Sequence, residues 1–141
     1  MFLRSGPAMR NSTQPVMLIT DDDRSFRETM AEVFSRRGFA PLLAANGEEA
    51  IHVAQEAIVH VALFDFHMPQ RTGLESISAC RSMGINIPYI LLTGALDSAI
   101  ATQAEDVEVF SLLEKPVSIQ IVTGVVKEAM ASHYPWFESG R

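Results

Sequence analysis

Five short apolar runs, with helix-like stretches between them, restrict the fold of this chain more than any other feature of its sequence. Apolar runs of this length are typical of strands that are buried on both faces of a parallel sheet. The stretches between them place apolar residues three and four positions apart, as on the inner side of a helix. The sequence therefore predicts an α/β domain with strands at residues 16–20, 39–44, 59–65, 87–93 and 109–113.

The length of 141 residues fits one domain with short tails. Residues 1–14 are rich in small and polar residues and in proline, which predicts a disordered N-terminal tail. The domain itself is expected to span residues 15–132. The rest of the chain, residues 133–141, is expected to form a C-terminal tail whose Trp136 and Phe137 either pack on the domain or belong to an interface.

Charge and cysteine content exclude several classes of protein. A formal net charge of -6 argues against direct binding of nucleic acid by this chain, because such binding normally needs a basic surface. The single cysteine, Cys80, cannot form an internal disulfide, which favours a reducing, cytoplasmic location. No apolar run approaches the ~20 residues of a membrane helix, so no membrane association is expected.

Polar residues of three kinds follow four of the predicted strands. The first strand ends at Asp21-Asp22-Asp23, the third at Asp65 and the fourth at Thr93, and Lys115 follows the fifth. Because the carboxyl ends of parallel strands lie at one edge of a sheet, where ligands bind, we expect these side chains to meet there. Each has a plain structural interpretation by itself, such as a helix cap for the aspartates, and only their joint placement favours a functional one.

The chemistry of this set fits phosphoryl transfer to an aspartate. Several carboxylates close together repel one another unless a cation lies among them, and oxygen ligands of this kind suit Mg²⁺. One carboxylate can attack the phosphorus while a hydroxyl and an ammonium group stabilise the charge on the phosphoryl oxygens. The residue types at the predicted edge therefore match those that this reaction requires.

From about Val16 to Met130 the sequence resembles the receiver domain of bacterial two-component response regulators. The resemblance is carried by an apolar run before each of four motifs, namely Asp21-Asp22-Asp23, Asp65-Phe66-His67-Met68-Pro69 with Gly73-Leu74 after it, Thr93-Gly94, and Lys115-Pro116. It implies a flavodoxin-like fold, a doubly wound five-stranded parallel sheet in the order 2-1-3-4-5 flanked by five helices. It also implies a cis peptide bond before Pro116.

The resemblance assigns a role to each residue of the edge. Asp65 is expected to be the phospho-acceptor. Mg²⁺ is expected to be held by Asp21, Asp22, Asp65 and the backbone carbonyl of His67. The side chains of Thr93 and Lys115 are expected to hold the phosphoryl group.

The resemblance further implies that the chain is a signalling domain of a phosphorelay and not an enzyme, and that it catalyses only its own phosphorylation and dephosphorylation. The expected donor is a sensor histidine kinase or a histidine phosphotransfer protein. The expected recipient of the signal is a downstream protein or an output domain that lies outside this sequence, with an oligomer as a further possibility. The output surface is expected on the last helix, strand and helix.

Three positions depart from the family pattern or lie beside the site. Leu112 stands where an aromatic residue commonly reports phosphorylation, which leaves the coupling between Thr93 and this position open. A Gly-Ala pair is missing before the fifth strand, so the helix at residues 97–105 is expected to be short or irregular. His67 flanks the phosphoryl site and either modulates dephosphorylation or is an exposed loop residue without a role.

Two other functions are compatible with parts of the sequence. Asp21-Asp22-Asp23-Arg24-Ser25 loosely fits the first motif of haloacid-dehalogenase-type phosphatases, but Glu128 alone stands where that family needs an acidic pair. That interpretation also leaves the Asp65 motif unexplained. The second alternative is a receiver-like adaptor that is not phosphorylated and acts through protein contacts, which Leu112 leaves open.

Overall fold

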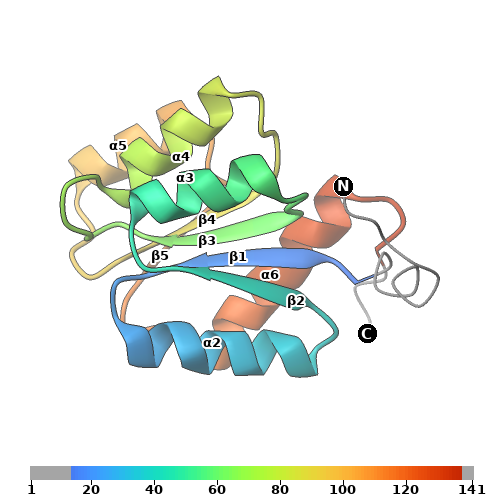
Figure 1. Cartoon of the computed structure of the whole chain (residues 1–141). Coiled ribbons are helices and arrows are strands. Elements are labelled where there is room, and N and C mark those ends of the chain that lie inside the picture. The colour runs from blue at the N-terminus through green and yellow to red at the C-terminus, as the bar shows by residue number, and fades with distance from the viewer. Residues whose placement is uncertain (1–13, 138–141) are drawn as a thin grey trace.

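Five parallel strands form one sheet in the computed structural model, which describes residues 14–137 (Figure 1). The strands are β1 (Val16–Thr20), β2 (Ala40–Ala44), β3 (Val61–Asp65), β4 (Tyr89–Thr93) and β5 (Ser111–Glu114). Their order across the sheet is β2-β1-β3-β4-β5, which confirms the predicted topology. The order reverses beside β1, so the carboxyl ends of β1 and β3 border the crevice where this fold class binds ligands.

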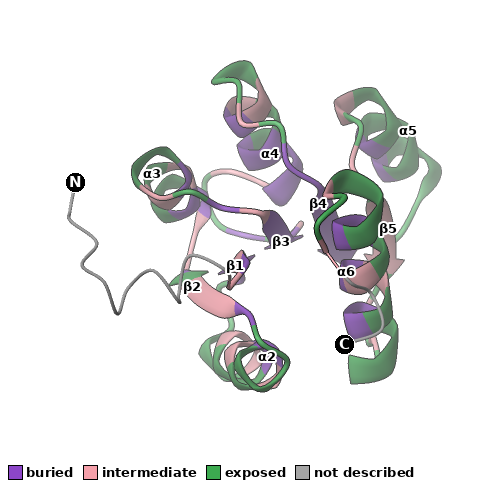
Figure 2. Ribbon diagram, turned by 90° about the vertical axis from the view of Figure 1, so that its right-hand side faces the viewer, coloured by how far each residue is buried: buried purple, intermediate pink, exposed green. Residues whose placement is uncertain are grey.

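Five helices cover the two faces of the sheet (Figures 1 and 2). Three of them lie on one face, α3 (Gly47–Glu56), α4 (Gly73–Ser82) and α5 (Ser98–Val107), and two on the other, α2 (Arg24–Arg36) and α6 (Ile119–His133). Figure 2 shows the buried residues on the sides of the helices that face the strands. Because helices cover both faces of the sheet, the strands are buried on both sides and consist of nearly continuous apolar runs.

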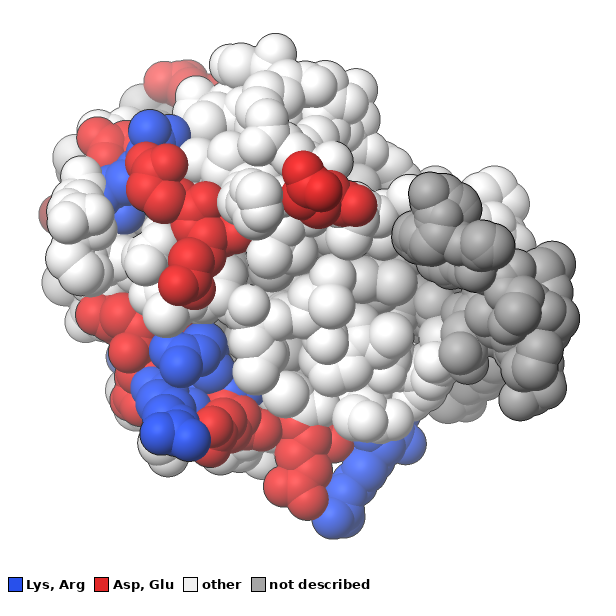
Figure 3. All heavy atoms as spheres, in the orientation of Figure 1, with Lys and Arg blue, Asp and Glu red and all other residues white. Residues whose placement is uncertain are grey.

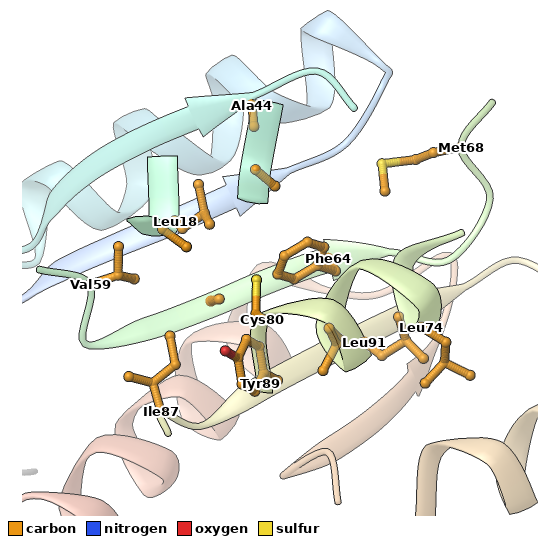
Figure 4. Packing of buried hydrophobic residues seen from close by; sticks show 14 of the residues in the cluster. Leu18, Ala44, Val59, Phe64, Met68, Leu74, Cys80, Ile87, Tyr89 and Leu91 are labelled. Carbon is orange, nitrogen blue, oxygen red and sulfur yellow. The ribbon is translucent and has the colours of Figure 1, made fainter. Parts of the chain in front are cut away.

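Each face of the sheet has its own hydrophobic core. Along β1, Leu18 packs with the core under α3 and α4, while Met17 and Ile19 pack with the core under α2 and α6, as the alternation of strand side chains requires. Figure 4 shows the first of these cores, where the rings of Phe64 and Tyr89 lie 6.2 Å apart. Both rings are almost fully buried, and truncation of such a ring to alanine typically costs about 3–5 kcal/mol.

Every helix starts with a side-chain cap directly after a strand or its loop. The side chain of Asp23 accepts hydrogen bonds from two backbone N–H groups of the first turn of α2. Thr72 forms a capping box with Glu75 at the start of α4. Such caps stabilise a helix by about 1 kcal/mol. The remaining helices are capped in the same way, by the side chains of Asn46, Asp97 and Ser118.

The segment between β4 and β5 differs from its prediction. The helix there is regular and spans Ser98–Val107, so the expectation of a short or irregular helix was wrong. It ends at Glu108, whose left-handed φ of 62° lets its N–H reach two carbonyls of the last turn. An αL residue is the common way to end a helix and need not be glycine. This turn also moves the start of the last strand from residue 109 to Ser111.

An aromatic cluster lies where the strands begin, at the end of the sheet opposite to their carboxyl ends. We define it as His60, Tyr134, Trp136, Phe39 and Phe137. The Tyr134 hydroxyl donates to the His60 carbonyl oxygen over 2.7 Å, and the His60 ring lies 5.5 Å from the Tyr134 ring and 5.7 Å from the Trp136 ring. Phe137 in turn contacts Phe39 at 6.3 Å. Tyr134, Trp136 and Phe137, which follow α6, therefore pack on the domain.

The predicted N-terminal tail falls almost entirely on residues 1–13, which lie outside the described part of the chain. Among the described residues, no helix combines the length and the apolar character that a membrane crossing would need.

Candidate functional site

The predicted polar residues lie together at the carboxyl edge of the sheet. Asp21 directly follows β1, Asp65 is the last residue of β3 and Thr93 is the last residue of β4. Lys115 follows β5, and its backbone N–H donates to the Thr93 carbonyl over 2.8 Å. The peptide bond between Lys115 and Pro116 is cis, as expected. Four strands that are neighbours in the sheet thus bring these side chains to one place.

Three carboxylates form the centre of the site. One carboxylate oxygen from each of Asp21, Asp22 and Asp65 lies within 4.8 Å of the other two. Asp21 and Asp65 are buried, with 1% and 5% of their surfaces exposed, whereas Asp22 is exposed. Oxygen ligands at this spacing suit a hard cation such as Mg²⁺, which keeps several waters and takes a small number of carboxylates.

Lys115 supplies a positive charge to the two buried carboxylates. Its Nζ lies 2.9 Å from Oδ2 of Asp21 and 3.3 Å from Oδ1 of Asp65. The same ammonium group lies 4.6 Å from the centre of the Phe26 ring, where a cation–π contact is favourable. The side chain of Lys115 is 27% exposed, so solvent still reaches the site beside it.

The surroundings of Asp65 make its charged form less favourable than that of a solvated aspartate. Burial raises the pKa of Asp65, the charge of Asp21 raises it further, and Lys115 only partly offsets the two. Burial by itself would lower the pKa of Lys115, but its hydrogen bonds with and attraction to Asp21 and Asp65 outweigh burial and raise that pKa. A group that adds positive charge near Asp65 would therefore relieve an unfavourable interaction.

Thr93 is fully buried, and its hydroxyl has two neighbours. The backbone N–H of Ala95 donates to Oγ1 of Thr93 over 3.2 Å. On the other side, Nε2 of His67 lies 3.2 Å from the same Oγ1. His67 itself is exposed, on the loop between β3 and α4. The sequence analysis used the backbone carbonyl of His67 and its position beside the site, and it did not predict this side-chain contact.

Leu112 lies away from the carboxylates. It pairs in register with Leu91 of β4 and packs, half-buried, against the core under α3, α4 and α5. At this position the chain therefore has an aliphatic side chain that belongs to the hydrophobic core, as the sequence indicated. Whether it takes part in a switch with Thr93 stays a prediction.

Two further contacts at the site were not predicted. Arg27, one turn into α2, donates from Nη1 to the backbone carbonyl of Asp21 over 2.9 Å. The Phe26 ring lies under Lys115, from which it is separated by most of the chain. No local sequence pattern links Phe26 to Lys115, so this contact could not be predicted.

The structure gives a geometric reason for Met68 and Gly73 in the loop after Asp65. A Cβ atom on Gly73 would lie 2.3 Å from the Asp65 backbone carbonyl, so α4 can start this close to the strand only with glycine. Met68 is buried in the core beside Phe64 (Figure 4). Both residues fix the backbone that carries Asp65 and His67.

Charged side chains gather at this edge of the molecule. In Figure 3, Asp, Glu, Lys and Arg side chains lie mainly on the left side, where the strands end in Figure 1, and along the lower side, over α2. The middle of the same view, over β2 and between α2 and α3, has almost none. The edge where the strands end is therefore one of the charged parts of this face.

Comparison with known proteins identifies the family. Residues 17–127 match the family described as response regulator receiver domain. Regulatory protein AtoC of Escherichia coli (strain K12) is 28% identical over 114 residues, which cover 81% of this chain and 25% of AtoC. Sporulation initiation phosphotransferase F of Bacillus subtilis (strain 168) is 25% identical over 112 residues, which cover 79% of this chain and 90% of the relative.

Solved structures agree with the sequence match. Chemotaxis protein CheY4 of Vibrio cholerae superposes with a TM-score of 0.79 at 25% identity, over 83% of this chain and 99% of that chain. The chain spans a quarter of AtoC and 54% of response regulator RR06 of Streptococcus pneumoniae, so it matches only part of such relatives. The matched residues 17–127 include Asp21, Asp65, Thr93 and Lys115 and make up well over half of the sequence. The chain belongs to the response regulator receiver domains, a family of signalling domains in two-component systems.

Proposed function

We propose that this receiver domain accepts a phosphoryl group on Asp65 from a phosphohistidine and signals through the change that follows. The observation that carries the proposal is the arrangement of Asp65 beside Asp21 and Asp22, within 4.8 Å, with the Lys115 ammonium 3.3 Å away. Receiver domains of response regulators interact with histidine kinases or phosphotransfer proteins. The proposal includes both kinds of protein as possible donors to this chain.

The carboxylates fit the Mg²⁺ that receiver domains bind at an acidic pocket. Asp21, Asp22 and Asp65 would hold the ion, and the backbone carbonyl of His67 would complete the protein ligands. Asp22 is exposed and Asp21 and Asp65 are buried, so the ion would sit at the mouth of the site with room for water. The bound ion supplies positive charge to the phosphoryl oxygens and to Asp65.

In the reaction, one carboxylate oxygen of Asp65 attacks phosphorus and forms an O–P bond. The P–N bond to the donor histidine breaks, and its electron pair stays on the imidazole nitrogen. The Thr93 hydroxyl and the Lys115 ammonium donate hydrogen bonds to the phosphoryl oxygens, on which charge accumulates. Hydrolysis of the resulting acyl phosphate by water returns Asp65 to its carboxylate form.

Signalling would follow from the movement of Thr93 and Lys115 towards the phosphoryl group. The loops after β4 and β5 carry these residues, so their movement biases the surface formed by α5, β5 and α6. That surface would contact a downstream protein or an output domain, in the cytoplasm. The alternative is a receiver-like adaptor that is never phosphorylated, and the aliphatic Leu112 is the observation that favours it.

The test is phosphorylation with acetyl phosphate and Mg²⁺, read by intact mass. We expect a gain of one phosphoryl mass in the parent, no gain when Mg²⁺ is chelated, and no gain in Asp65→Asn. Asp106→Asn is the matched control, because Asp106 is an exposed aspartate of α5, near its far end. It should be phosphorylated like the parent.

A parent protein that gains no mass is then tested for binding of beryllofluoride with Mg²⁺, because small donors are poor substrates for some receivers. Binding that depends on Asp65 would support the proposal despite a slow donor reaction. Absence of both would favour the adaptor. Equal phosphorylation of Asp65→Asn and the parent would place the acceptor elsewhere and contradict the assignment.

A further inference from the structure

The contact between His67 and Thr93 links the loop that follows the acceptor aspartate to the end of the neighbouring strand β4. His67 lies two residues after Asp65, and Thr93 ends the neighbouring strand. Their side chains meet at 3.2 Å, between Nε2 and Oγ1. The imidazole is exposed and its ring also contacts the Phe66 ring at 4.9 Å, so it reaches from the surface to a buried hydroxyl.

The tautomer of His67 decides where the Thr93 hydroxyl proton points. Oγ1 already accepts from the N–H of Ala95 over 3.2 Å. When Nε2 of His67 carries no proton, it is an acceptor 3.2 Å from Oγ1, and the hydroxyl can donate its one proton to it. In that tautomer the hydroxyl proton is directed to the imidazole and away from the acceptor carboxylate.

We propose that His67, in the tautomer with Nε2 unprotonated, is a positioning residue that holds the Thr93 hydroxyl in a resting arrangement and competes with the phosphoryl group for its proton. The inference rests on the proposed function, in which that same hydroxyl donates to a phosphoryl oxygen. Phosphorylation then has to break the contact with His67 before Thr93 can engage. His67 thereby lowers the affinity of the site for a phosphoryl group.

The position of this restraint explains how the chain can control Thr93 with an aliphatic residue at 112. Leu112 packs in the core and offers no polar atom to the hydroxyl. His67 approaches from the loop after β3 instead. The loop is held in place by the buried side chain of Met68 and by Gly73 against the Asp65 carbonyl, so the imidazole is carried on a fixed backbone.

The experiment is a double-mutant cycle read by the affinity for beryllofluoride in the presence of Mg²⁺. The variants are His67→Ala, Thr93→Val and the double variant, with His52→Ala as a control on the exposed side of α3. Fluorine NMR titration reports the affinity of each protein. Loss of one such hydrogen bond changes an equilibrium by roughly two- to tenfold, so we expect His67→Ala to bind the probe tighter by about that factor.

The cycle separates competition for Thr93 from other roles of His67. In the Thr93→Val background, His67→Ala should leave the affinity unchanged, and His52→Ala should leave the affinity of either background unchanged. A weaker affinity of His67→Ala would mean that the imidazole itself binds the phosphoryl group, which overturns the inference. An equal gain with and without the Thr93 hydroxyl would overturn it as well.

Failure of the proposed function gives a different result. A parent protein that does not bind beryllofluoride overturns both the proposed function and the inference. Binding by the parent with no change in His67→Ala overturns the inference alone. A second measurement uses the proteins without beryllofluoride. In their amide NMR spectra, the resonances of Thr93 and Ala95 should shift in His67→Ala and not in His52→Ala.

Discussion

The two ends of the sheet are built on opposite principles. At the carboxyl end, two buried carboxylates lie close to each other, and one lysine lies 2.9 Å from the first and 3.3 Å from the second. At the other end, the aromatic cluster packs His60, Tyr134 and Trp136 ring against ring, and the Tyr134 hydroxyl and Nδ1 of His60 form hydrogen bonds with the backbone. The first end holds like charges that repel one another, whereas the second holds aromatic groups in favourable contact.

The difference separates the end of the sheet that carries the proposed phosphorylation site from the end that contributes to the stability of the fold. Uncompensated charge in a buried site lowers stability and is tolerated where a ligand is to bind. The aromatic cluster has no such stored interaction, and burial there raises the pKa of Tyr134 to about 12, so its hydroxyl stays protonated. Substitutions at the carboxyl end should therefore change phosphoryl chemistry as well as stability, whereas substitutions in the aromatic cluster should change stability alone.

The largest effect is expected from Lys115→Met. Removal of the ammonium leaves Asp21 and Asp65 as two buried carboxylates without their cation, a change that costs 3–5 kcal/mol in fully buried pairs. Because Lys115 is partly exposed, we expect a loss of about 2 kcal/mol in urea unfolding without Mg²⁺. Mg²⁺ should restore part of it. A variant as stable as the parent without Mg²⁺ would show that the lysine does not offset the carboxylates.

A smaller loss is expected at the other end from Tyr134→Phe. The substitution removes only the hydroxyl that donates to the His60 carbonyl over 2.7 Å. One such hydrogen bond contributes about 1 kcal/mol, and we expect a loss of that size in urea unfolding. The affinity for beryllofluoride and Mg²⁺ should equal that of the parent. A change in that affinity would mean that the two ends are coupled.

Asp65→Asn should change stability in the opposite direction. The pKa of Asp65 is raised by burial and by Asp21, so its charged form is disfavoured in the folded protein. Asparagine has a similar shape and no charge, and we expect a gain of about 0.5 kcal/mol in unfolding free energy at neutral pH without Mg²⁺. With Mg²⁺ present, the order of the two proteins should reverse. A destabilised asparagine variant without Mg²⁺ would contradict the proposed electrostatics.

The smallest effect is a pH dependence that comes from His60. Burial lowers the pKa of His60, and its Nδ1 accepts the N–H of Val16 over 2.9 Å, which requires an unprotonated nitrogen. The unfolded chain then binds more protons than the folded one below the ordinary pKa of histidine. Stability from this group is present above that pKa and is lost as the pH falls from it through the lowered pKa of the folded protein.

His60→Gln isolates this contribution. Unfolding free energies at pH 7.5 and pH 5.5 should differ by a few tenths of a kcal/mol less in His60→Gln than in the parent, because His60 is half-buried and solvent weakens the effect. His52→Gln, an exposed histidine of α3, should keep the pH dependence of the parent. An unchanged pH dependence in His60→Gln would assign the effect to other groups.

Sequence patterns predicted the parts of the site that depend on strand ends. Asp21, Asp65, Thr93 and Lys115 each follow an apolar run, and a parallel sheet brings such positions together whatever the details of the loops. The contact of the His67 side chain with Thr93 depends on the path of one loop and on a rotamer. Neither leaves a periodic signal, so the sequence could predict the position of His67 and not its partner.

The helix before β5 shows the same limit in the fold. A missing Gly-Ala pair predicted an irregular helix, but Glu108 adopts the left-handed conformation that ends it regularly. Non-glycine residues take that conformation at a small cost, which tertiary contacts can offset. Here Nη2 of Arg81 donates to the Glu108 carbonyl over 2.8 Å. This contact joins residues far apart in the sequence and could not be inferred from local composition.

The aromatic cluster also determines the route by which the polypeptide enters and leaves the domain. Pro15 accepts a hydrogen bond from Ala40 at the start of β2, and Phe137 contacts Phe39 beside it. Both ends of the described chain therefore emerge at the end of the sheet remote from Asp65. A fluorescent protein or an affinity tag joined directly before Gln14 or directly after Phe137 would leave the domain at the end remote from the acceptor and keep the approach of a donor histidine open.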